Sequence, residues 1–509
     1  MRYYSDDARG GEEVRAPQFI LASTSRQKSN RISSMAAKGA AIAYLGVGSN
    51  LGCRSGNISR ALERLASRHS IRRLDTSLMY ESAAVGAPEG DAAGAFLNAV
   101  VKVTLPGGMK PSNLLDALKE TESELGRDQS AARNASRCID LDILLYFGSE
   151  SNECERVVDS CRDLFIPHPR MHERRFVLEP LCDVISKEHD FHPDLNVSFR
   201  VLRDSDNGDA GDEVSRVLPL SFDDRQSEKV WHWGSARCAT KIMGILNVTP
   251  DSFSDGGSFD ESVETAVNAA MEMRAQGASV IDIGGESTRP GADSVSIDEE
   301  LQRVVPVINA IRDRDPSAVL SIDTTKPQVA REAVNAGANI INDISGGLFY
   351  DGTMLGVAAE LGVPYILMHT RGTPKTMSSM TSYGNGDDED LVRIINQELD
   401  ERVKAAAIAG IPRWNIVIDP GIGFAKTSGQ NLSILRHAGC FGNGKLPTLI
   451  GASRKGFLGA LTGKTSAAQR DDATHATTAA AVLGGALLVR VHAVGGASDV
   501  AKVAGAIFR

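Results

Sequence analysis

The sequence predicts an α+β domain followed by an α/β domain of the (β/α)8, or TIM, barrel class. The first observation is length, because 509 residues exceed what one ordinary hydrophobic core supports. The second is that short apolar runs alternate eight times with segments of helical apolar spacing in the second half of the chain. The third is that strands and helices of the first half follow a mixed order with hairpin-like returns, which is typical of an α+β domain.

Bulk composition is that of a soluble globular protein. The formal charge of -10 argues against a nucleic-acid-binding surface as the main function. No apolar run approaches the roughly 20 residues that span a bilayer, so no membrane partner is expected. The seven cysteines are scattered and contain no CxxC pair, which favours a reducing compartment over a disulfide framework or a zinc site.

Residues 1–40 precede the first expected strand and allow two interpretations. Positions 14–40 contain several basic residues and serines but no acid, which is typical of an organellar presequence. Four acidic residues among the first 13 favour a disordered tail instead, with Met35 as an alternative start. Both interpretations stay open, so the expected location is cytoplasmic or mitochondrial.

The first domain is expected over residues 41–203. Its strands and helices are expected, in order, as a strand at 41–48, a helix through Leu62, an extended stretch at 78–80, a strand at 96–105, a helix at 113–126 and a strand at 139–147. Residues 204–228 are acidic and lack periodicity, which predicts a linker between the domains.

The barrel is expected over residues 229–509. Its eight apolar runs, which read as buried parallel strands, begin near residues 242, 280, 319, 339, 365, 416, 448 and 486. Helical apolar spacing is clearest at 263–278, 301–314 and 391–410. Each run ends in a polar or charged residue, and the carboxyl ends of barrel strands are where such folds keep their active site. The eight endings therefore predict one pocket.

Two groups of these residues differ in chemistry. A ring-binding set from four different strand ends offers donors and acceptors to a small heteroaromatic ring, since a buried carboxylate accepts two parallel hydrogen bonds from an N–C–N edge. A single aspartate would more often be a helix cap or an ion-pair partner, but four converging endings favour binding. An oxyanion set suits phosphate or pyrophosphate, because guanidinium geometry matches an oxyanion bidentately. The ring-binding set is Asp323, Asn342, Asp419 and Lys455, and the oxyanion set is Asn247, Thr288, Arg289, Arg490 and His492.

Asp140 and Asp142 form a candidate metal site in the first domain. They lie two residues apart on an expected strand, so both carboxylates point to one face. Mg²⁺ takes few carboxylates and keeps room for nucleotide phosphates, although an edge strand with a solvated polar face would show the same pattern. Nearby basic residues could bind phosphates, and two aromatic residues could sandwich a flat ring; these are Arg127, Arg133, Arg137, Phe96 and Phe176.

Motifs over residues 238–509 resemble dihydropteroate synthase. They are ILNVTPDSFSDGG, GGESTRPGA, SIDTTKP, NIINDISGG, LMHTRGTPKTM, DPGIGFAK, GASRKGFLG and RVHAV. The resemblance implies condensation of 6-hydroxymethyl-7,8-dihydropterin pyrophosphate with p-aminobenzoate, with release of pyrophosphate. It implies that the ring-binding set holds the pterin, with Asp323 and Lys455 catalytic, and that the oxyanion set holds pyrophosphate with Mg²⁺ near Asn247. It further implies a p-aminobenzoate site lined by Pro290, Phe424 and Ser453.

Motifs over about 41–190 resemble 6-hydroxymethyl-7,8-dihydropterin pyrophosphokinase. They are GVGSNLG, FLNAVV, ELGR, RCIDLDILLY and IPHPRMHERRFVLEPL. The resemblance implies a ferredoxin-like domain that transfers pyrophosphate from ATP to the pterin alcohol with two Mg²⁺ ions. The implied roles are metal binding by Asp140 and Asp142, pterin binding by Phe96, Asn98 and Phe176, ATP binding by Glu122, His168 and Arg174, and catalysis by Arg127 and Arg137.

The first domain departs from its family pattern in two loops. Asn134, Ala135 and Ser136 stand where Trp-Gly-Pro is common, and Gln129 and Ser130 stand where basic residues are expected. Ala83 and Ala84 replace the usual prolines of the pterin loop. The paired aspartates and the aromatic residues are present, so we expect the kinase activity to be retained.

The leading hypothesis is a bifunctional folate-pathway enzyme whose first domain makes the ester that the second consumes. One alternative is an active synthase barrel with a non-catalytic N-terminal domain. Another is a pterin-binding barrel for methyl transfer, which the oxyanion set and the lack of a cobalamin module disfavour. The resemblance also implies a homodimer or higher homo-oligomer formed through the barrel.

Overall fold

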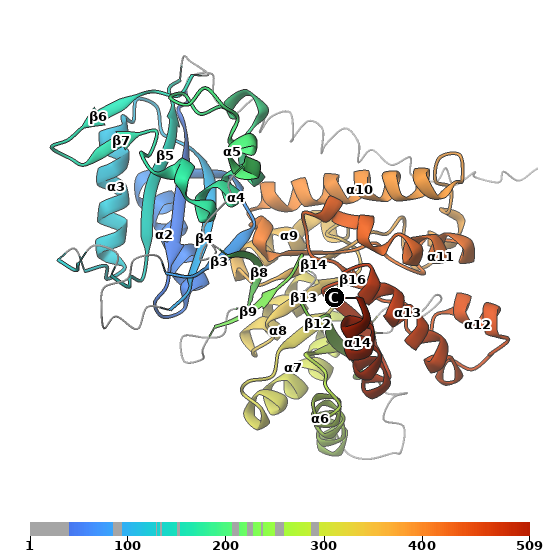
Figure 1. Cartoon of the computed structure of the whole chain (residues 1–509). Coiled ribbons are helices and arrows are strands. Elements are labelled where there is room, and N and C mark those ends of the chain that lie inside the picture. Colours follow the sequence, from blue (N-terminus) through green and yellow to red (C-terminus); the bar gives the residue numbers. More distant parts are fainter. Residues whose placement is uncertain are drawn as a thin grey trace, which may run out of the picture.

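The chain folds into two domains that lie side by side, the first drawn in blue to green and the second in green to red (Figure 1). The computed structural model describes residues 40–84, 94–128, 130–132, 135–149, 153–205, 213–220, 228–235, 238–249, 259–286 and 295–508. The tail or presequence expected over residues 1–40 lies outside the described residues except for its last position, so both interpretations stand. Within the described part, no helix is long and apolar enough to cross a membrane.

A seven-stranded sheet forms the centre of the first domain, with order β5-β1-β4-β3-β8-β9 and β2 paired to β4. β1 lies between β4 and β5 and is antiparallel to both. Helices α2 and α3 each connect two strands of this sheet, which gives the ferredoxin-like arrangement that was expected. The strands are β1 (Ile42–Ser49), β2 (Arg72–Thr76), β3 (Met79–Ser82), β4 (Phe96–Thr104), β5 (Asp140–Phe147), β8 (Val214–Leu220) and β9 (Lys229–His232), and a separate hairpin contains β6 (Val157–Asp159) and β7 (Leu164–Ile166).

Two clusters of buried apolar side chains stabilise this domain. In one, α2 and α3 pack Ile58, Leu65 and Leu118 against the sheet. In the other, α4 packs Leu178 and Leu181 beside β5. The helices are α2 (Arg54–His69), α3 (Pro111–Glu124), α4 (Arg175–Val184) and α5 (Phe199–Ser205).

The segment expected to be a linker, residues 204–228, differs from that prediction because it contains β8. This strand pairs with β3 of the first domain, and β9 pairs with β8. Leu218 of β8 and Trp231 of β9 are buried in a cluster with residues at the amino ends of the barrel strands, among them Met243 and Val280. The β8–β9 hairpin therefore extends one domain's sheet and covers the bottom of the other domain.

The second domain is the expected barrel of eight parallel strands. Their order is β15-β14-β13-β12-β11-β10-β17-β16, and a parallel bridge between Ile418 and Thr448 closes the ring. β11 to β15 are buried at every position, as continuous apolar runs predict. The strands are β10 (Lys241–Asn247), β11 (Val280–Gly284), β12 (Leu320–Asp323), β13 (Ile340–Asp343), β14 (Tyr365–Met368), β15 (Ile416–Asp419), β16 (Leu449–Ile450) and β17 (Leu488–Val491).

Helices surround the barrel, and local signals set several of their ends. Ser296 caps α7, Asp387 caps α10, and Thr427 forms a capping box with Gln430 at α11. Gly410 ends α10 in the left-handed conformation at φ 110°. The helices are α6 (Phe259–Ala275), α7 (Ile297–Arg314), α8 (Pro327–Asn335), α9 (Thr353–Leu361), α10 (Asp388–Ala409), α11 (Ser428–Arg436), α12 (Gly456–Thr462), α13 (Asp471–Leu483) and α14 (Val494–Phe508).

Candidate active sites

The barrel site begins with one row of residues across four neighbouring strands. Asn247, Gly284, Asp323 and Asn342 are successive register partners at the carboxyl ends of β10 to β13. Parallel pairing places their Cα atoms level with one another, so three polar side chains emerge at one height. Gly284 contributes no side chain between Asn247 and Asp323, and a Cβ atom there would lie 3.6 Å from Asp323 Cβ.

Arg490 of β17 connects two carboxylates in this pocket. Its Nε donates to Asp282 Oδ2 at 2.6 Å, and its Nη2 donates to Asp323 Oδ2 at 2.6 Å. Asn342 Nδ2 donates to the same oxygen of Asp282 at 3.1 Å. Arg490 of the predicted oxyanion set is thus in direct contact with Asp323 of the ring-binding set, so the two sets meet in one pocket.

Asp282 is a site residue that the sequence analysis missed. It is fully buried on β11, two residues before Gly284, so its side chain faces the same side as that row and lies one layer deeper. The sequence did contain a sign of this role, namely an aspartate inside the apolar run VIDI. A strand buried at every position buries that carboxylate, and a buried aspartate is normally paired with a cation or a hydrogen-bond donor.

Both carboxylates in contact with Arg490 keep one oxygen for a further partner. Among the described residues, neither Asp282 Oδ1 nor Asp323 Oδ1 has a hydrogen-bond partner. Burial raises the pKa of Asp323 to about 7, although the Arg490 guanidinium opposes the shift. Buried polar atoms are normally hydrogen-bonded, so these two oxygens suit the donors of a bound molecule.

Asp419, Lys455 and Phe424 form the neighbouring part of the pocket. Asp419, at the end of β15, is buried and accepts a hydrogen bond from Gly421 N at 2.7 Å. Burial raises its pKa, and Lys455 partly offsets this rise. Lys455 Nζ donates to Ile422 O and lies 4.8 Å from the centre of the Phe424 ring. Burial lowers the pKa of Lys455 to about 8, with Asp419 opposing the shift.

Ser453 and His492 lie together beside this group. Ser453 Oγ is 2.9 Å from His492 Nδ1, and it also accepts a hydrogen bond from His492 N at 3.1 Å. Asn247 lies at the end of β10 as expected. The other predicted residues of the oxyanion set and the p-aminobenzoate site, Thr288, Arg289 and Pro290, lie outside the described residues.

Three neighbouring polar residues serve the structure around the pocket. Asp343 follows Asn342 on β13 and therefore faces the opposite side, where it accepts a hydrogen bond from Tyr365 Oη at 2.6 Å. His369 Nε2 forms a hydrogen bond with Glu398 Oε2 of α10 at 2.9 Å. Arg454 is paired with Asp471 of α13 at 2.6 Å.

In the first domain, strand register collects the predicted residues on adjacent strands. Gly48 of β1 pairs with Asn98 on one side and with Asp140 on the other. A Cβ atom at Gly48 would lie 3.3 Å from Asn98 Oδ1 and 3.7 Å from Phe96 Cδ1, so glycine keeps this surface open. Asn98 Nδ2 donates to Ser82 Oγ at 3.0 Å.

Two arginines contact Asp140. Arg127 Nη1 donates to Asp140 Oδ1 at 2.6 Å, and Arg137 Nη2 lies 3.1 Å from Asp140 Oδ2. Arg137 also lies over the Phe96 ring, with its Cζ 5.5 Å from the ring centre, and Arg174 lies 5.7 Å from the centre of Phe176. Aromatic rings that can stack on a flat ligand thus lie next to arginines that can bind phosphates, and one of these arginines, Arg137, also contacts the Asp140 carboxylate.

Asp142 lies on the same face of β5 as Asp140. Burial, followed by repulsion from Asp140, raises its pKa to about 7. Burial and the nearby Arg174 lower the pKa of His168 to about 4, so its imidazole is neutral near pH 7.

Glu122, which was expected to contact ATP, is bonded to groups of the protein itself. It is fully buried, and its Oε1 accepts the backbone N–H of Leu141 at 2.7 Å, between the two aspartates. The same carboxylate pairs with Arg127. Asn50, a residue of the GVGSNLG motif with no assigned role, accepts Arg137 N at 2.7 Å. Both residues hold the start of β5 in place.

The donor set of β5 fits a divalent cation bound together with phosphates. Within the described residues, no group of three or more His, Cys, Asp or Glu side chains could hold a metal ion by itself. Mg²⁺ characteristically takes only one or two carboxylates and completes its shell with water and phosphate oxygens. A cation beside Asp140 and Asp142 would also offset the repulsion that raises the pKa of Asp142.

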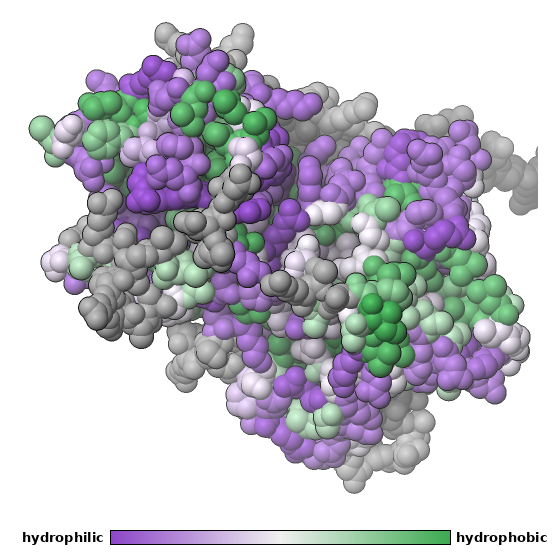
Figure 2. Space-filling model, in the orientation of Figure 1, coloured by the Kyte–Doolittle hydropathy of each residue, from purple (hydrophilic) through white to green (hydrophobic). Residues whose placement is uncertain are grey.

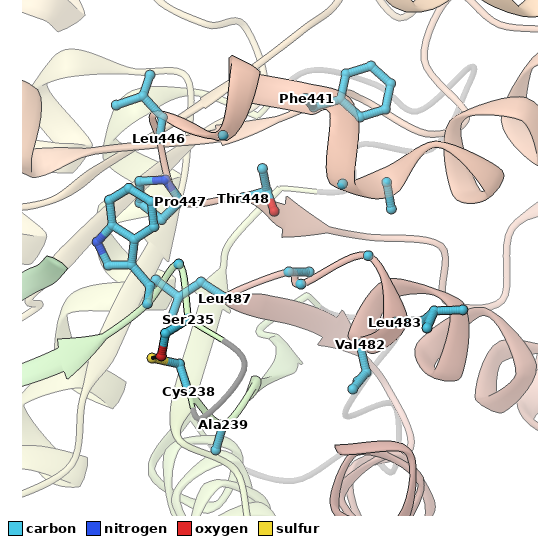
Figure 3. Close-up of a pocket in the computed structure, with 18 of the residues that line it drawn as sticks. Ser235, Cys238, Ala239, Phe441, Leu446, Pro447, Thr448, Val482, Leu483 and Leu487 are labelled. Carbon is cyan, nitrogen blue, oxygen red and sulfur yellow. Dashed lines mark hydrogen bonds between the residues drawn. The ribbon is translucent and has the colours of Figure 1, made fainter. Parts of the chain in front are cut away.

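A separate cavity of about 320 Å³ lies at the opposite, amino end of the barrel strands (Figure 3). Trp233, Thr448 and Leu487 line it, together with the turn after α13. It contains none of the predicted site residues.

Comparisons with known proteins match both halves of the chain. The family of 7,8-dihydro-6-hydroxymethylpterin-pyrophosphokinase (HPPK) matches residues 44–186, and the family described as pterin binding enzyme matches residues 243–492. The two resemblances expected from the motifs are therefore confirmed.

Curated relatives carry both halves in one chain. "Folate synthesis bifunctional protein, mitochondrial" of Arabidopsis thaliana is 39% identical over 489 residues, which cover 91% of this chain and 83% of that protein. "Folic acid synthesis protein fol1" of Pneumocystis carinii is 39% identical over 481 residues, which cover 92% of this chain but only 60% of that protein. This chain thus spans about three fifths of the fungal relative. A solved structure of a Plasmodium falciparum HPPK-DHPS triple mutant with pteroate has a TM-score of 0.71 at 23% identity and covers 92% of this chain and 95% of that one, which supports the fold.

Proposed function

Because the chain belongs to the family of bifunctional folate synthesis proteins, we propose that it catalyses two consecutive reactions on a pterin. The first domain transfers pyrophosphate from ATP to 6-hydroxymethyl-7,8-dihydropterin. The barrel then joins the product to p-aminobenzoate and releases pyrophosphate. The observation that carries this proposal is the pairing, in one chain, of the Asp140–Asp142 face with the barrel cluster around Arg490.

In the kinase reaction, the hydroxymethyl oxygen attacks the β-phosphorus of ATP. The bond from that phosphorus to the oxygen bridging the α-phosphate breaks, AMP leaves, and the hydroxyl proton is lost. Arg127 and Arg137 lie beside Asp140 and supply positive charge for the triphosphate. Phe96 and Phe176, each beside an arginine, bind the faces of the pterin ring, and Asn98 binds its edge.

In the synthase reaction, the bond between the pterin methylene carbon and the pyrophosphate oxygen breaks, and the aniline nitrogen bonds to that carbon and loses a proton. Asp323 stabilises the positive charge that develops on the pterin, and its free oxygen accepts from the ring edge. Asn342, Asp419 and Lys455 complete the contacts to the ring, whereas Asn247, Thr288, Arg289, Arg490 and His492 bind pyrophosphate. Pro290, Phe424 and Ser453 line the p-aminobenzoate site.

We propose Mg²⁺ as the metal ion of both reactions. Asp140 and Asp142 would hold it in the kinase site, and Asn247 would hold it with pyrophosphate in the barrel. Bound there, Mg²⁺ would neutralise phosphate charge. The chemistry of the paired aspartates supports the kinase part of this proposal.

A second copy of the chain is proposed to pack on the outer face of the barrel. Figure 2 shows a hydrophobic area over α14. Val503, Ile507 and Phe508 of this helix and Leu483 of α13 are more than half exposed, which is unusual for neighbouring large apolar side chains. Light scattering on the purified chain should give the mass of a dimer, and Ile507→Asp should lower it to that of a monomer; a monomeric wild type would contradict this proposal.

The location and the domain limits are also proposals. The Arabidopsis thaliana and Pisum sativum relatives carry the word mitochondrial in their names, which supports reading residues 1–40 as a presequence. The position of β8 and β9 supports a barrel that begins at residue 238, with these two strands shared between the domains. Fusing residues 1–45 to a fluorescent protein would test the location, because a presequence would direct it to the organelle.

Each reaction can be measured separately on the purified chain. With ATP and the pterin alcohol alone, AMP should form; with supplied pterin pyrophosphate and p-aminobenzoate, pyrophosphate and dihydropteroate should form in equal amounts. Absence of AMP beside an active synthase reaction would overturn the kinase proposal and leave a non-catalytic first domain.

A further inference from the structure

The loop of residues 420–426, which follows β15, is held in an unusual backbone shape. Gly421, Gly423 and Ala425 all have positive φ, at 72°, 79° and 51°. Alanine rarely adopts this left-handed conformation, because its Cβ approaches the following carbonyl oxygen. A Cβ at Gly421 would lie 1.9 Å from His369 O, so only glycine allows this approach to β14. Side-chain contacts to its backbone must therefore maintain its shape.

On the pocket side, Asp419 and Lys455 hold the first half of the loop. Asp419 Oδ1 accepts Gly421 N at 2.7 Å, and Lys455 Nζ donates to Ile422 O. The Phe424 ring lies 4.8 Å from Lys455 Nζ and thus borders the pocket. These contacts leave the second half of the loop, which carries Phe424, to other residues.

Lys426 and Tyr383 hold this second half. Lys426 Nζ donates to Phe424 O at 2.9 Å, and Tyr383 Oη donates to Ala425 O at 3.1 Å. Both side chains are buried, Lys426 to within 9% and Tyr383 to within 2% of full burial. Two successive carbonyl groups are therefore each fixed by a buried side-chain donor.

Lys426 is itself fixed by a chain of hydrogen bonds that reaches α10. Its Nζ lies 3.0 Å from His369 Nδ1, and His369 Nε2 lies 2.9 Å from Glu398 Oε2. Burial acts to raise the pKa of Glu398, but bonds from His369 and Arg371 outweigh it and lower the value to about 2, so the carboxylate only accepts. His369 Nε2 must then carry the proton, and Nδ1 accepts from Lys426. The Lys426 amine is therefore held in place by two acceptors, His369 Nδ1 and Phe424 O.

We propose that Lys426 and Tyr383 are positioning residues that set the place of Phe424 for the p-aminobenzoate ring. The proposal rests on the function proposed above for Phe424. Neither residue needs to touch a substrate, because each acts through a backbone carbonyl group of the loop. Loss of either contact would let Ala425 leave its left-handed conformation and displace the Phe424 ring, while the pterin-binding groups on the strand ends stay in place.

Two substitutions and one control test this role. Tyr383→Phe removes only the hydroxyl that contacts Ala425 O, and Lys426→Met removes the amine while keeping similar volume. Tyr365→Phe is the control, because it also removes a buried hydroxyl of the barrel, but one that contacts Asp343 rather than the loop. Synthase rates would be measured with supplied pterin pyrophosphate and p-aminobenzoate, each varied in turn, together with the melting temperature of every variant.

Tyr383→Phe should raise the KM for p-aminobenzoate about three- to tenfold, the equivalent of one hydrogen bond, and Lys426→Met should raise it about tenfold or more. The KM for pterin pyrophosphate should stay within about twofold of wild type in both, and Tyr365→Phe should change neither KM. Equal increases for both substrates, or no increase for p-aminobenzoate in Tyr383→Phe, would overturn the proposal. If Lys426→Met does not fold, Tyr383→Phe decides the question alone. A wild-type chain without synthase activity would instead refute the proposed function.

Discussion

Replacing Asp282 by asparagine should impair the synthase reaction strongly, although this residue was absent from the sequence-based site. Asp282 Oδ2 accepts two hydrogen bonds, from Arg490 Nε at 2.6 Å and from Asn342 Nδ2 at 3.1 Å. Asparagine keeps the shape but removes the charge, and one amide oxygen cannot hold a guanidinium as firmly as a carboxylate. Arg490 and Asn342 would then both lose a fixed orientation in the pterin pocket.

The magnitude follows from the bond to Arg490. A hydrogen bond to a charged group contributes about 1.5–3 kcal/mol, and a tenfold change in rate corresponds to about 1.36 kcal/mol. The kcat/KM of the synthase reaction should therefore fall about 10- to 150-fold in Asp282→Asn. The assay uses supplied pterin pyrophosphate and p-aminobenzoate, so that kinase activity does not enter the measured rate.

Asp343→Asn is the matched control for this experiment. Asp343 is equally buried on the adjacent β13, but it faces away from the pocket and accepts from Tyr365 Oη and Ser345 Oγ. Its substitution should lower the melting temperature while the kcat/KM of the folded enzyme stays within about twofold. Wild-type kcat/KM in Asp282→Asn, or an equal loss in both variants, would refute the positioning role of Asp282.

The remaining predictions concern the two active sites and the hairpin between the domains. Asp140→Ala should abolish AMP formation while the barrel still converts supplied pterin pyrophosphate, and Lys455→Ala should do the reverse; loss of both activities in either variant would contradict two independent sites. Burial lowers the pKa of Lys455 to about 8, so its cation is present below that pH and is lost above it. The kcat/KM of the synthase reaction should therefore fall as pH rises through about 8. A pH profile that stays flat to pH 10 would disprove this role of the cation. Trp231→Ala should lower the free energy of unfolding by about 3–5 kcal/mol, because the indole ring of this β9 residue is buried against the bottom of the barrel. Denaturant titration of the full chain measures this change, and a loss below about 1 kcal/mol would contradict the stabilising role of the ring.

The barrel and its row of strand ends could be predicted because their signal is local. Each strand is a continuous apolar run, and the residue that follows it, such as Asp323 or Asp419, must emerge at the carboxyl end of the sheet. The register then brings these residues together without further information. The same holds for Asp140 and Asp142, whose spacing of two fixes a shared face.

The residues that were missed or placed differently depend on contacts distant in sequence. Asp282 obtains its role from Asn342 and Arg490, which lie 60 and 208 positions away. β8 contains Arg216 and Pro219, which weaken a strand pattern, and its partner β3 lies more than 130 residues upstream. An acidic, non-periodic neighbourhood predicted a linker there, whereas burial against the barrel decided the outcome.

The most direct test of the two-reaction function is a single reaction mixture that contains the purified full chain, ATP, 6-hydroxymethyl-7,8-dihydropterin, p-aminobenzoate and Mg²⁺. AMP, pyrophosphate and dihydropteroate would be quantified together over time. We expect one AMP and one pyrophosphate for each dihydropteroate once the intermediate has reached steady state, and neither dihydropteroate nor AMP with Asp140→Ala. Dihydropteroate formed without AMP, or AMP formed without any dihydropteroate, would contradict a chain in which the first domain supplies the second.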